Sequence, residues 1–343
     1  MLLYLHIPFC DSKCHYCSFN SFTTNHHLKK SYIKALQTQL LHDLQHFCIQ
    51  KNSIESIFVG GGTPSCLKAS YYEEIFTILN PYLCVDAEIT FEANPNSASY
   101  AWLQAIKDLG ATRVSFGVQS FDAKKLQFLG RAHTPKEALQ AVENAQRAGF
   151  ENVSIDLIYN CAIDSKKLLQ NDIAIATNIA INHISAYALT IEPNTPFASK
   201  SNTLSQQEFG FFIKELIPFK QYEVSNFGSY ESRHNKGYWQ LKNYLGIGAG
   251  AVGFWKDFRY YPPTTLQSYI QNPIQREIER LSQEDLRTEK IFLGLRSCIG
   301  VEKKLLDPAK IATLLQEDKI YEDTERIYNK NFFIADEMAL FLL

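Results

Sequence analysis

The sequence lacks any uninterrupted apolar segment of the roughly 18 residues that a membrane-spanning helix requires. It also lacks a signal-peptide pattern, because the opening segment Met1–His6 carries no lysine or arginine and no apolar run of the required length follows it. We therefore expect a cytoplasmic protein with no membrane span.

A strong net charge is missing as well. The 34 lysines and arginines nearly balance the 36 aspartates and glutamates, which leaves a formal net charge of −2. Nucleic-acid-binding proteins usually present a basic surface, so the composition predicts no nucleic acid partner. The chain has 45% hydrophobic and 13% aromatic residues, enough for a sizeable core. Its 343 residues exceed the usual size of one domain, so we expect a large unit with a smaller one attached.

From residue 1 to about 225, short β-rich runs alternate with longer amphipathic segments, which predicts repeated βα units and a parallel sheet. The expected strands are Leu2–Leu5, Ser56–Val59, Glu88–Ala93, Arg113–Phe116, Asn152–Ile158 and His183–Ala188. The expected helices include Ser31–Phe47, Ala101–Leu109 and Pro135–Ala148. Six units are too few for a closed eight-stranded barrel, so the predicted fold is α/β, an open, partial (β/α)6 TIM-like barrel with its chemistry at the carboxyl ends of the strands.

The pattern changes after residue 225. Residues 226–265 are rich in glycine and aromatic side chains, and residues 266–343 contain the helical segments Arg287–Leu295 and Pro308–Gln316. We expect three units, with boundaries near 225 and 265, the last of them a small and mainly helical domain.

Three cysteines crowd the loop after the first strand: Cys10, Cys14 and Cys17. Neighbouring thiolates repel one another unless a metal neutralises them, and soft sulfur ligands favour zinc or iron–sulfur clusters. Zinc with His15 or His6 as the fourth ligand is one reading, although zinc sites usually contain C-x2-C pairs. With no fourth cysteine nearby, the alternative is an iron–sulfur cluster with one iron open to a ligand. The other five cysteines are scattered, and we expect each to be a small core residue.

The segment Tyr4–Cys17 reads YLHIPFC-x3-C-x-YC. It resembles the signature of radical S-adenosylmethionine (SAM) proteins, in particular the coproporphyrinogen dehydrogenase superfamily. The resemblance implies a radical SAM barrel in which Cys10, Cys14 and Cys17 hold a 4Fe-4S cluster and Tyr4 and Tyr16 lie at the cofactor. The open iron would bind SAM, and a low-potential electron donor would reduce it.

A glycine run, Gly60–Pro64, follows the second strand. Alone it fits a plain βα turn, since glycine allows tight turns and close backbone approach. It also resembles the GGGTP motif of the same family, which implies that Gly62 and Thr63 contact the methionine amino group of SAM.

Four polar residues match further family positions: Glu92, Gln119, Arg131 and Asp156. Each could instead be a strand-end cap or a surface ion pair, but a carboxylate within an apolar strand is costly to bury without a partner. By resemblance, Glu92 and Arg131 hold SAM, while Gln119 and Asp156 face its adenosine or, in the enzymatic branch, a second SAM molecule. The chain departs from the family at 159–163, where it reads YNCAI and the family usually reads YGLP followed by a glutamine–threonine pair.

Three features indicate the branch of the family. Position 19 is Phe, where the dehydrogenase has a further cysteine, and only nine residues precede Cys10, where it has a long arm. The segment His234–Trp239 reads HNKGYW and resembles the HNxxYW motif of HemW-type heme chaperones, within a match that runs from Tyr222 to Ala251. An imidazole beside aromatic rings can ligate heme iron. A hydrogen-bonded loop histidine is the simpler alternative, but with the whole motif present we predict that His234 contacts heme.

The resemblance implies a heme chaperone that binds a 4Fe-4S cluster, SAM and heme and passes heme to acceptors such as respiratory hemoproteins, with transient contact to membrane-associated ones. The alternative is an enzyme, oxygen-independent coproporphyrinogen III dehydrogenase, and a zinc-stabilised adaptor is a third class. We assign no catalytic residue.

Overall fold

The computed structural model describes residues 1–343. Its centre is an eleven-stranded sheet in the order β11-β10-β9-β8-β1-β2-β3-β4-β5-β6-β7. The strands are β1 Leu2–Ile7, β2 Ile54–Gly61, β3 Leu83–Ala93, β4 Arg113–Gln119, β5 Asn152–Tyr159, β6 His183–Ala188, β7 Asn226–Gly228, β8 Tyr244–Ile247, β9 Gly253–Trp255, β10 Phe258–Tyr261, β11 Glu277–Arg280, β12 Val301–Glu302, β13 Ile320–Glu322 and β14 Arg326–Asn329. The helices are α1 Lys29–His46, α2 Ser70–Leu79, α3 Tyr100–Asp108, α4 Ala123–Leu129, α5 Pro135–Arg147, α6 Lys166–Thr177, α7 Gly210–Leu216, α8 Arg233–Trp239, α9 Leu266–Gln271, α10 Gln283–Leu295, α11 Pro308–Gln316 and α12 Ala335–Leu342.

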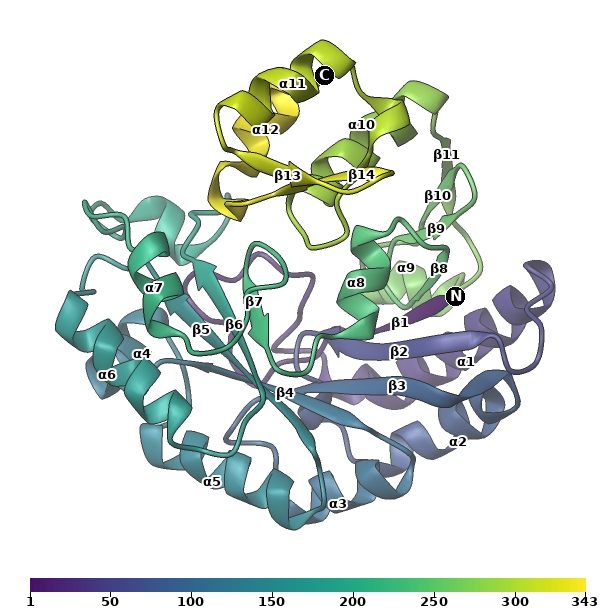
Figure 1. Ribbon diagram of the computed structural model, residues 1–343. Coiled ribbons are helices and arrows are strands. Elements are labelled where there is room, and N and C mark those ends of the chain that lie inside the picture. The colour runs from purple at the N-terminus through teal and green to yellow at the C-terminus, as the bar shows by residue number, and fades with distance from the viewer.

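Six parallel strands, β1 to β6, form the predicted partial barrel, and helices α1 to α6 cover its outer face (Figure 1). The sheet does not close, because antiparallel β7 ends it beside β6 while β8 continues it beyond β1. Each predicted strand is present, with ends shifted by a few residues. The α/β fold class is therefore confirmed.

The strands alternate between an apolar outer face and a polar inner one. On β3, for example, Ile89 and Phe91 belong to the main hydrophobic core under the helices, whereas Glu88 and Thr90, which alternate with them, are buried without belonging to it. Side chains of successive strand residues point to opposite faces. The barrel interior is consequently lined with groups that can hydrogen bond.

The helix ends carry clear local signals. Thr134 and Glu137 form a reciprocal capping box at the start of α5, where Pro135 occupies the first turn. Gly130 ends α4 in a left-handed conformation with φ of 71°. That turn directs the chain back toward the barrel mouth, where Arg131 enters the site.

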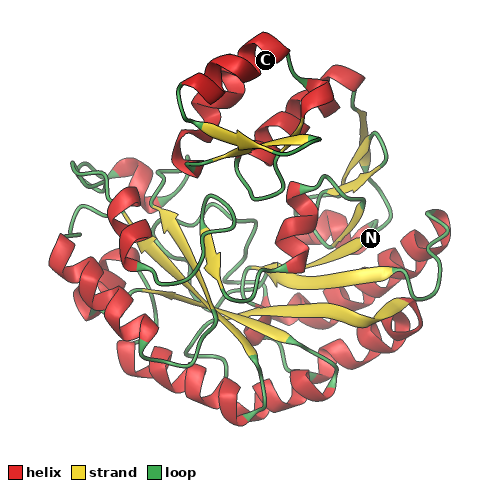
Figure 2. Ribbon diagram, viewed as in Figure 1, coloured by secondary structure: helices red, strands yellow, loops and turns green.

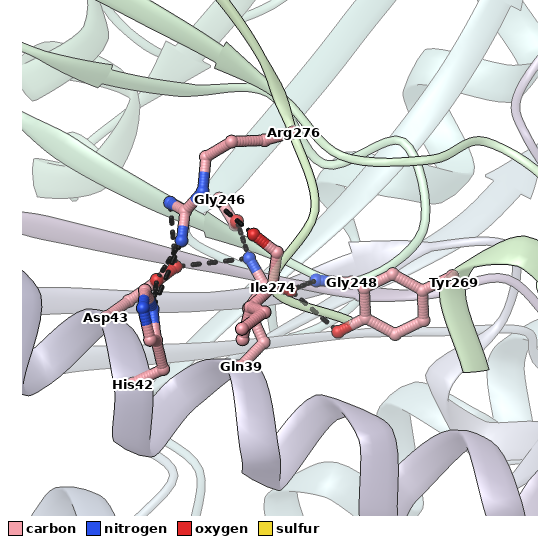
Figure 3. A network of polar contacts seen from close by, with 8 residues as sticks. All are labelled: Gln39, His42, Asp43, Gly246, Gly248, Tyr269, Ile274 and Arg276. Carbon is pink, nitrogen blue, oxygen red and sulfur yellow. Dashed lines mark hydrogen bonds and ion pairs between the residues drawn. The ribbon is translucent and has the colours of Figure 1, made fainter. Parts of the chain in front are cut away.

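The segment 226–265 continues the main sheet, because β8 pairs in parallel with β1. Strand β9 then pairs antiparallel with β8, and β10 pairs antiparallel with β9. A buried network ties it to α1 (Figure 3). The Gln39 amide donates to the Gly246 carbonyl at 3.0 Å and accepts from the Gly248 amide and the Tyr269 hydroxyl. The sheet thus runs across the boundary near residue 225, and the division into three units stays a prediction.

The carboxyl-terminal part has its own core and contains mostly helix, as Figure 2 shows. Helices α10 and α11 pack on a three-stranded antiparallel sheet in the order β12-β14-β13, and α12 packs against these two helices. The prediction missed this sheet, because strands of two to four residues leave no periodic signal.

All eight cysteines are free. The expectation that each scattered cysteine is a core residue was wrong: only Cys161 among the five is buried, and Cys48 is exposed. Among the helices of the structure, none is both long and apolar enough to cross a bilayer.

Candidate functional site

A cavity of about 900 Å³ lies at the carboxyl ends of the barrel strands. Ten of the twelve predicted site residues line it: Cys10, Cys14, Tyr16, Cys17, Gly62, Thr63, Glu92, Gln119, Arg131 and Asp156. These residues come from the loop after β1, the ends of β2 to β5, and the turn after α4. The partial barrel therefore gathers residues that are more than a hundred positions apart in the sequence.

The cysteine loop lies against the β2 turn. The Cys10 sulfur and the Thr63 hydroxyl oxygen are 3.4 Å apart. Burial raises the pKa of the Cys10 and Cys17 thiols. Because burial disfavours the thiolate, a bound metal is what would stabilise several thiolates here.

The histidines considered as fourth zinc ligands are engaged elsewhere. The His6 Nε2–H donates to the Asn20 carbonyl at 2.9 Å, so its Nδ1 accepts from the Tyr4 hydroxyl at 3.0 Å. The His15 Nδ1–H donates to the Phe128 carbonyl at 2.8 Å, which turns the ring toward the end of α4. These contacts favour the cluster over zinc.

The glycine run leaves room beside the cysteine loop. A Cβ atom at Gly62 would lie 2.8 Å from the Phe9 carbonyl oxygen and 3.0 Å from the Cys10 sulfur. Gly61 has a φ of 115°, which L side chains rarely adopt. Only glycine fits this turn, so the backbone forms a close cradle next to the first cysteine.

Arg131 connects the cysteine loop to the strand ends. Its Nη1 donates to the Cys14 sulfur at 3.2 Å, and its Nη2 donates to the Asn94 amide oxygen and the Gly117 carbonyl, both at 2.6 Å. The Nε–H is buried and has no partner. The alternative of a surface ion pair does not hold for this residue.

Glu92 is a buried carboxyl that accepts a hydrogen bond from the Gly61 amide at 3.0 Å. Burial, and secondarily the nearby Asp156, raise its pKa to about 7. Asp156 accepts from the Ser115 hydroxyl at 3.3 Å, and burial raises its pKa too. Neither side chain has a cationic partner within ion-pair distance, so both are free to receive a ligand's donors.

Gln119 has a strained backbone, with a φ of 67° at the end of β4. Its Oε1 atom is buried without a partner. Strain and an unpaired polar atom together commonly mark a ligand site.

The two other predicted residues lie outside the lining of the cavity. Tyr4 points to His6. His234 is fully buried: its Nδ1 and the Ser56 hydroxyl are 2.8 Å apart, and its ring packs against Phe58 and Tyr238 at centroid distances of 5.3 and 4.7 Å.

Sequence reasoning missed the far wall of the cavity. Arg296, Phe333 and Asp336 of the carboxyl-terminal part line it together with Phe211. Their contact with the barrel depends on packing between distant segments, which no local pattern records. Asn94, two residues beyond Glu92, is a further residue that sequence reasoning did not identify as the partner of Arg131.

The unusual loop after β5 keeps its shape through Asn160. This residue has a φ of 65°, where the family pattern has glycine, and asparagine tolerates that conformation better than most residues. Its Oδ1 accepts from the Phe209 amide at 3.0 Å, and its Nδ2 donates to Glu208 at 2.8 Å.

No group of three or more Cys, His, Asp or Glu side chains in the structure could hold a single metal ion. The chemistry of the residues at this cavity nevertheless suits an iron–sulfur cluster and a polar cofactor. Three free cysteines share one loop, and the glycine turn lies next to Cys10. The buried Gln119 Oε1 and Arg131 Nε atoms have no hydrogen-bond partner within the protein.

Residues 4–160 match the model of the radical SAM superfamily. The heme chaperone HemW of Lactococcus lactis is 33% identical over 98% of this chain and 95% of its own length. This chain belongs to the HemW family. The HemW proteins of Bacillus subtilis and Escherichia coli are 33% and 35% identical over 88% and 73% of this chain, and over 84% and 69% of their own lengths.

The fold has a solved counterpart in coproporphyrinogen III oxidase (HemN) of Escherichia coli, described as a radical SAM enzyme. The TM-score is 0.82, with 18% identity over 99% of this chain and 89% of that one. At this identity the likeness concerns the fold alone. Membership of the radical SAM superfamily implies a 4Fe-4S cluster and SAM.

Proposed function

We propose that this HemW-family chain is a heme chaperone that binds a 4Fe-4S cluster, SAM and heme and transfers heme to acceptor proteins. The observation that carries the proposal is the match to heme chaperones over nearly the whole chain, including the segment 222–251. The acceptors are expected to be hemoproteins such as respiratory ones, and the electron source a low-potential donor.

In this proposal Cys10, Cys14 and Cys17 hold the cluster, and the chemistry available when cluster and SAM are bound is one-electron cleavage of the sulfonium. The Gly62 backbone and the Thr63 hydroxyl would receive the methionyl end of SAM. Arg131 fixes the cysteine loop through its hydrogen bond to Cys14.

Two buried acceptors would orient the rest of SAM. The Glu92 carboxyl and the Gln119 amide oxygen would accept hydrogen bonds from its hydroxyl or amino groups. Asp156, beside Glu92, adds a second carboxyl that favours a cationic ligand.

The heme contact at His234 stays a prediction. Burial lowers the pKa of His234 to about 3, so the imidazole is neutral, as a metal ligand must be. Its Nε2 has no partner, whereas Nδ1 is bonded to Ser56. Because the ring is buried, heme could reach Nε2 only if α8 moves away from β2.

The test uses anaerobically purified protein reconstituted with iron and sulfide. Heme is titrated into wild type, His234→Gln and the exposed control His46→Gln, and the Soret band is followed. We expect stoichiometric uptake by wild type and the control, and weaker uptake or a shifted Soret band in His234→Gln.

The same samples are incubated with coproporphyrinogen III, SAM and dithionite. Sustained formation of protoporphyrinogen with weak heme binding would contradict the chaperone proposal and favour the dehydrogenase. Heme uptake by wild type that is unchanged in His234→Gln would retain the chaperone proposal and reject the contact at His234.

A further inference from the structure

A second cavity, of about 310 Å³, lies beside the first and has no role in the function proposed above. It is formed by residues 223–226, helix α8 and Leu293 of α10. Tyr187, Val224 and Ser225 line both cavities. Small-molecule sites begin at roughly this size, about 300 Å³.

Two buried side chains at this cavity have acceptor atoms without partners. Glu223 is 1% exposed and Asn226 is 4% exposed. Glu223 Oε1 and Asn226 Oδ1 form no hydrogen bond. Leaving such atoms unpaired costs roughly 1–3 kcal/mol each, so a ligand that donates hydrogen bonds would relieve the cost.

The only charged side chain in the lining of this cavity is acidic. Glu223 is the only acidic residue in its lining, and no lysine, arginine or histidine accompanies it. Burial raises the pKa of this carboxyl to about 7. An anionic ligand would meet a carboxylate with no basic residue to balance it, whereas a cation would supply the missing counter-charge.

The walls suit a cation as well. Tyr238 and Trp239 line the cavity together with Leu293. Aromatic faces attract ammonium groups, by about 2 kcal/mol or more where water is excluded. Aliphatic carbon atoms can pack against the same side chains.

We propose that this cavity binds a small organic ammonium ion. Its N–H groups donate to Glu223 and Asn226, and its carbon chain packs against Trp239 and Leu293. The residues of the HNxxYW segment then contribute to two different sites. His234 faces Ser56 inside the barrel, whereas Asn235, Tyr238 and Trp239 line the ammonium site.

The test uses the reconstituted full chain labelled with fluorotryptophan, with n-butylammonium chloride as the probe. The Trp239 resonance is assigned from Trp239→Phe. We expect this resonance to shift saturably with butylammonium, and not with potassium butyrate or potassium chloride at the same ionic strength.

Glu223→Gln should weaken butylammonium binding at least tenfold, while Glu284→Gln, an exposed change on α10, should leave it unaltered. Thermal melts check that both variants fold, and Asn226→Leu is the second variant if Glu223→Gln does not. A Trp239 shift caused by butyrate, equal affinity in a folded Glu223→Gln or Asn226→Leu, or no shift with butylammonium would each overturn the proposal.

Discussion

The Arg131 guanidinium donates a hydrogen bond to the sulfur of Cys14, the central residue of the three-cysteine loop, across 3.2 Å. This contact joins the cysteine loop to the turn after α4, and the same guanidinium reaches Asn94 and the Gly117 carbonyl. Hydrogen bonds and positive charge near cluster sulfurs raise the reduction potential, because they stabilise the more negative, reduced state.

Arg131→Met should therefore shift the midpoint potential of the reconstituted cluster to more negative values. A differential interaction of about 1 kcal/mol corresponds to about 40 mV for a one-electron couple. Redox titration monitored by electron paramagnetic resonance measures the shift. Arg147→Met, a surface change on α5, is the matched control. An unchanged potential in a variant with full cluster content would show that the contact does not act on the cluster.

Glu92 gives a prediction about pH. Its pKa is about 7 in the fold and 4.5 in the ordinary carboxyl, so the native state binds more protons than the unfolded state between these values. Ionisation of Glu92 therefore does not affect the free energy of unfolding below about pH 4.5. It lowers this free energy progressively as the pH rises from there to about 7, and the loss stays constant at higher pH.

Glu92→Gln keeps the acceptor for the Gly61 amide and removes the cost of ionisation. We expect the ligand-free variant to be more stable than wild type by on the order of 2–3 kcal/mol at pH 8, and by under about 1 kcal/mol at pH 5. Urea unfolding at the two pH values measures the difference, while equilibrium dialysis should show weaker SAM binding. A stability gain that is equal at both pH values would contradict this assignment.

The sequence supports some of these features more directly than others. The strand runs and the cysteine spacing are local patterns. Ten of the residues named from these patterns and from the family resemblance line one cavity, and their roles there stay predictions. The HNxxYW motif was recognised, but a motif cannot tell which side chain of a seven-residue helix enters the core. The structure turns His234 inward because the Glu88 carboxylate accepts from the backbone amides of Arg233 and His234, both at 2.9 Å, and fixes the start of α8.

The loop at 159–163 illustrates the opposite case, a departure that the structure explains. Asparagine at position 160 retains the left-handed conformation and adds two hydrogen bonds. Because asparagine tolerates this conformation better than most residues, a left-handed turn forms here at the position that holds glycine in the family pattern.

Lys125 supports this region from inside. Its side chain is fully buried, and its Nζ lies 2.7 Å from the Asp164 carboxylate and 3.8 Å from Asp172. Asp172 in turn accepts from the Ser120 hydroxyl and the Phe121 amide, both at 2.7 Å, directly after the strained Gln119. One lysine thereby holds both the β4 turn and the β5 loop at the cavity.

Lys125→Met should destabilise the protein by about 3–5 kcal/mol, because it leaves two buried carboxylates without a counter-charge. Adding Asp164→Asn should recover part of the loss, since it removes one of those charges. Lys124→Met, at the exposed neighbouring position, should change stability by less than about 0.5 kcal/mol. Urea unfolding of wild type and these three variants gives the values, and a Lys125→Met loss no greater than that of Lys124→Met would refute the role.

The last prediction concerns Arg276, which connects α1 to the carboxyl-terminal segments (Figure 3). Its guanidinium pairs with Asp43, whose side chain is 2% exposed, whereas the nearby pair of Arg280 and Asp257 has an arginine that is 75% exposed. Losing one partner of a buried pair leaves an uncompensated charge, so Arg276→Leu should cost about 3–5 kcal/mol. Arg280→Leu should cost about 0–1 kcal/mol, since water and salt screen exposed pairs. Equal losses in urea unfolding would mean that the network in Figure 3 adds no more than a surface contact, and that packing around Gln39 and Tyr269 alone fixes α1 to the sheet extension.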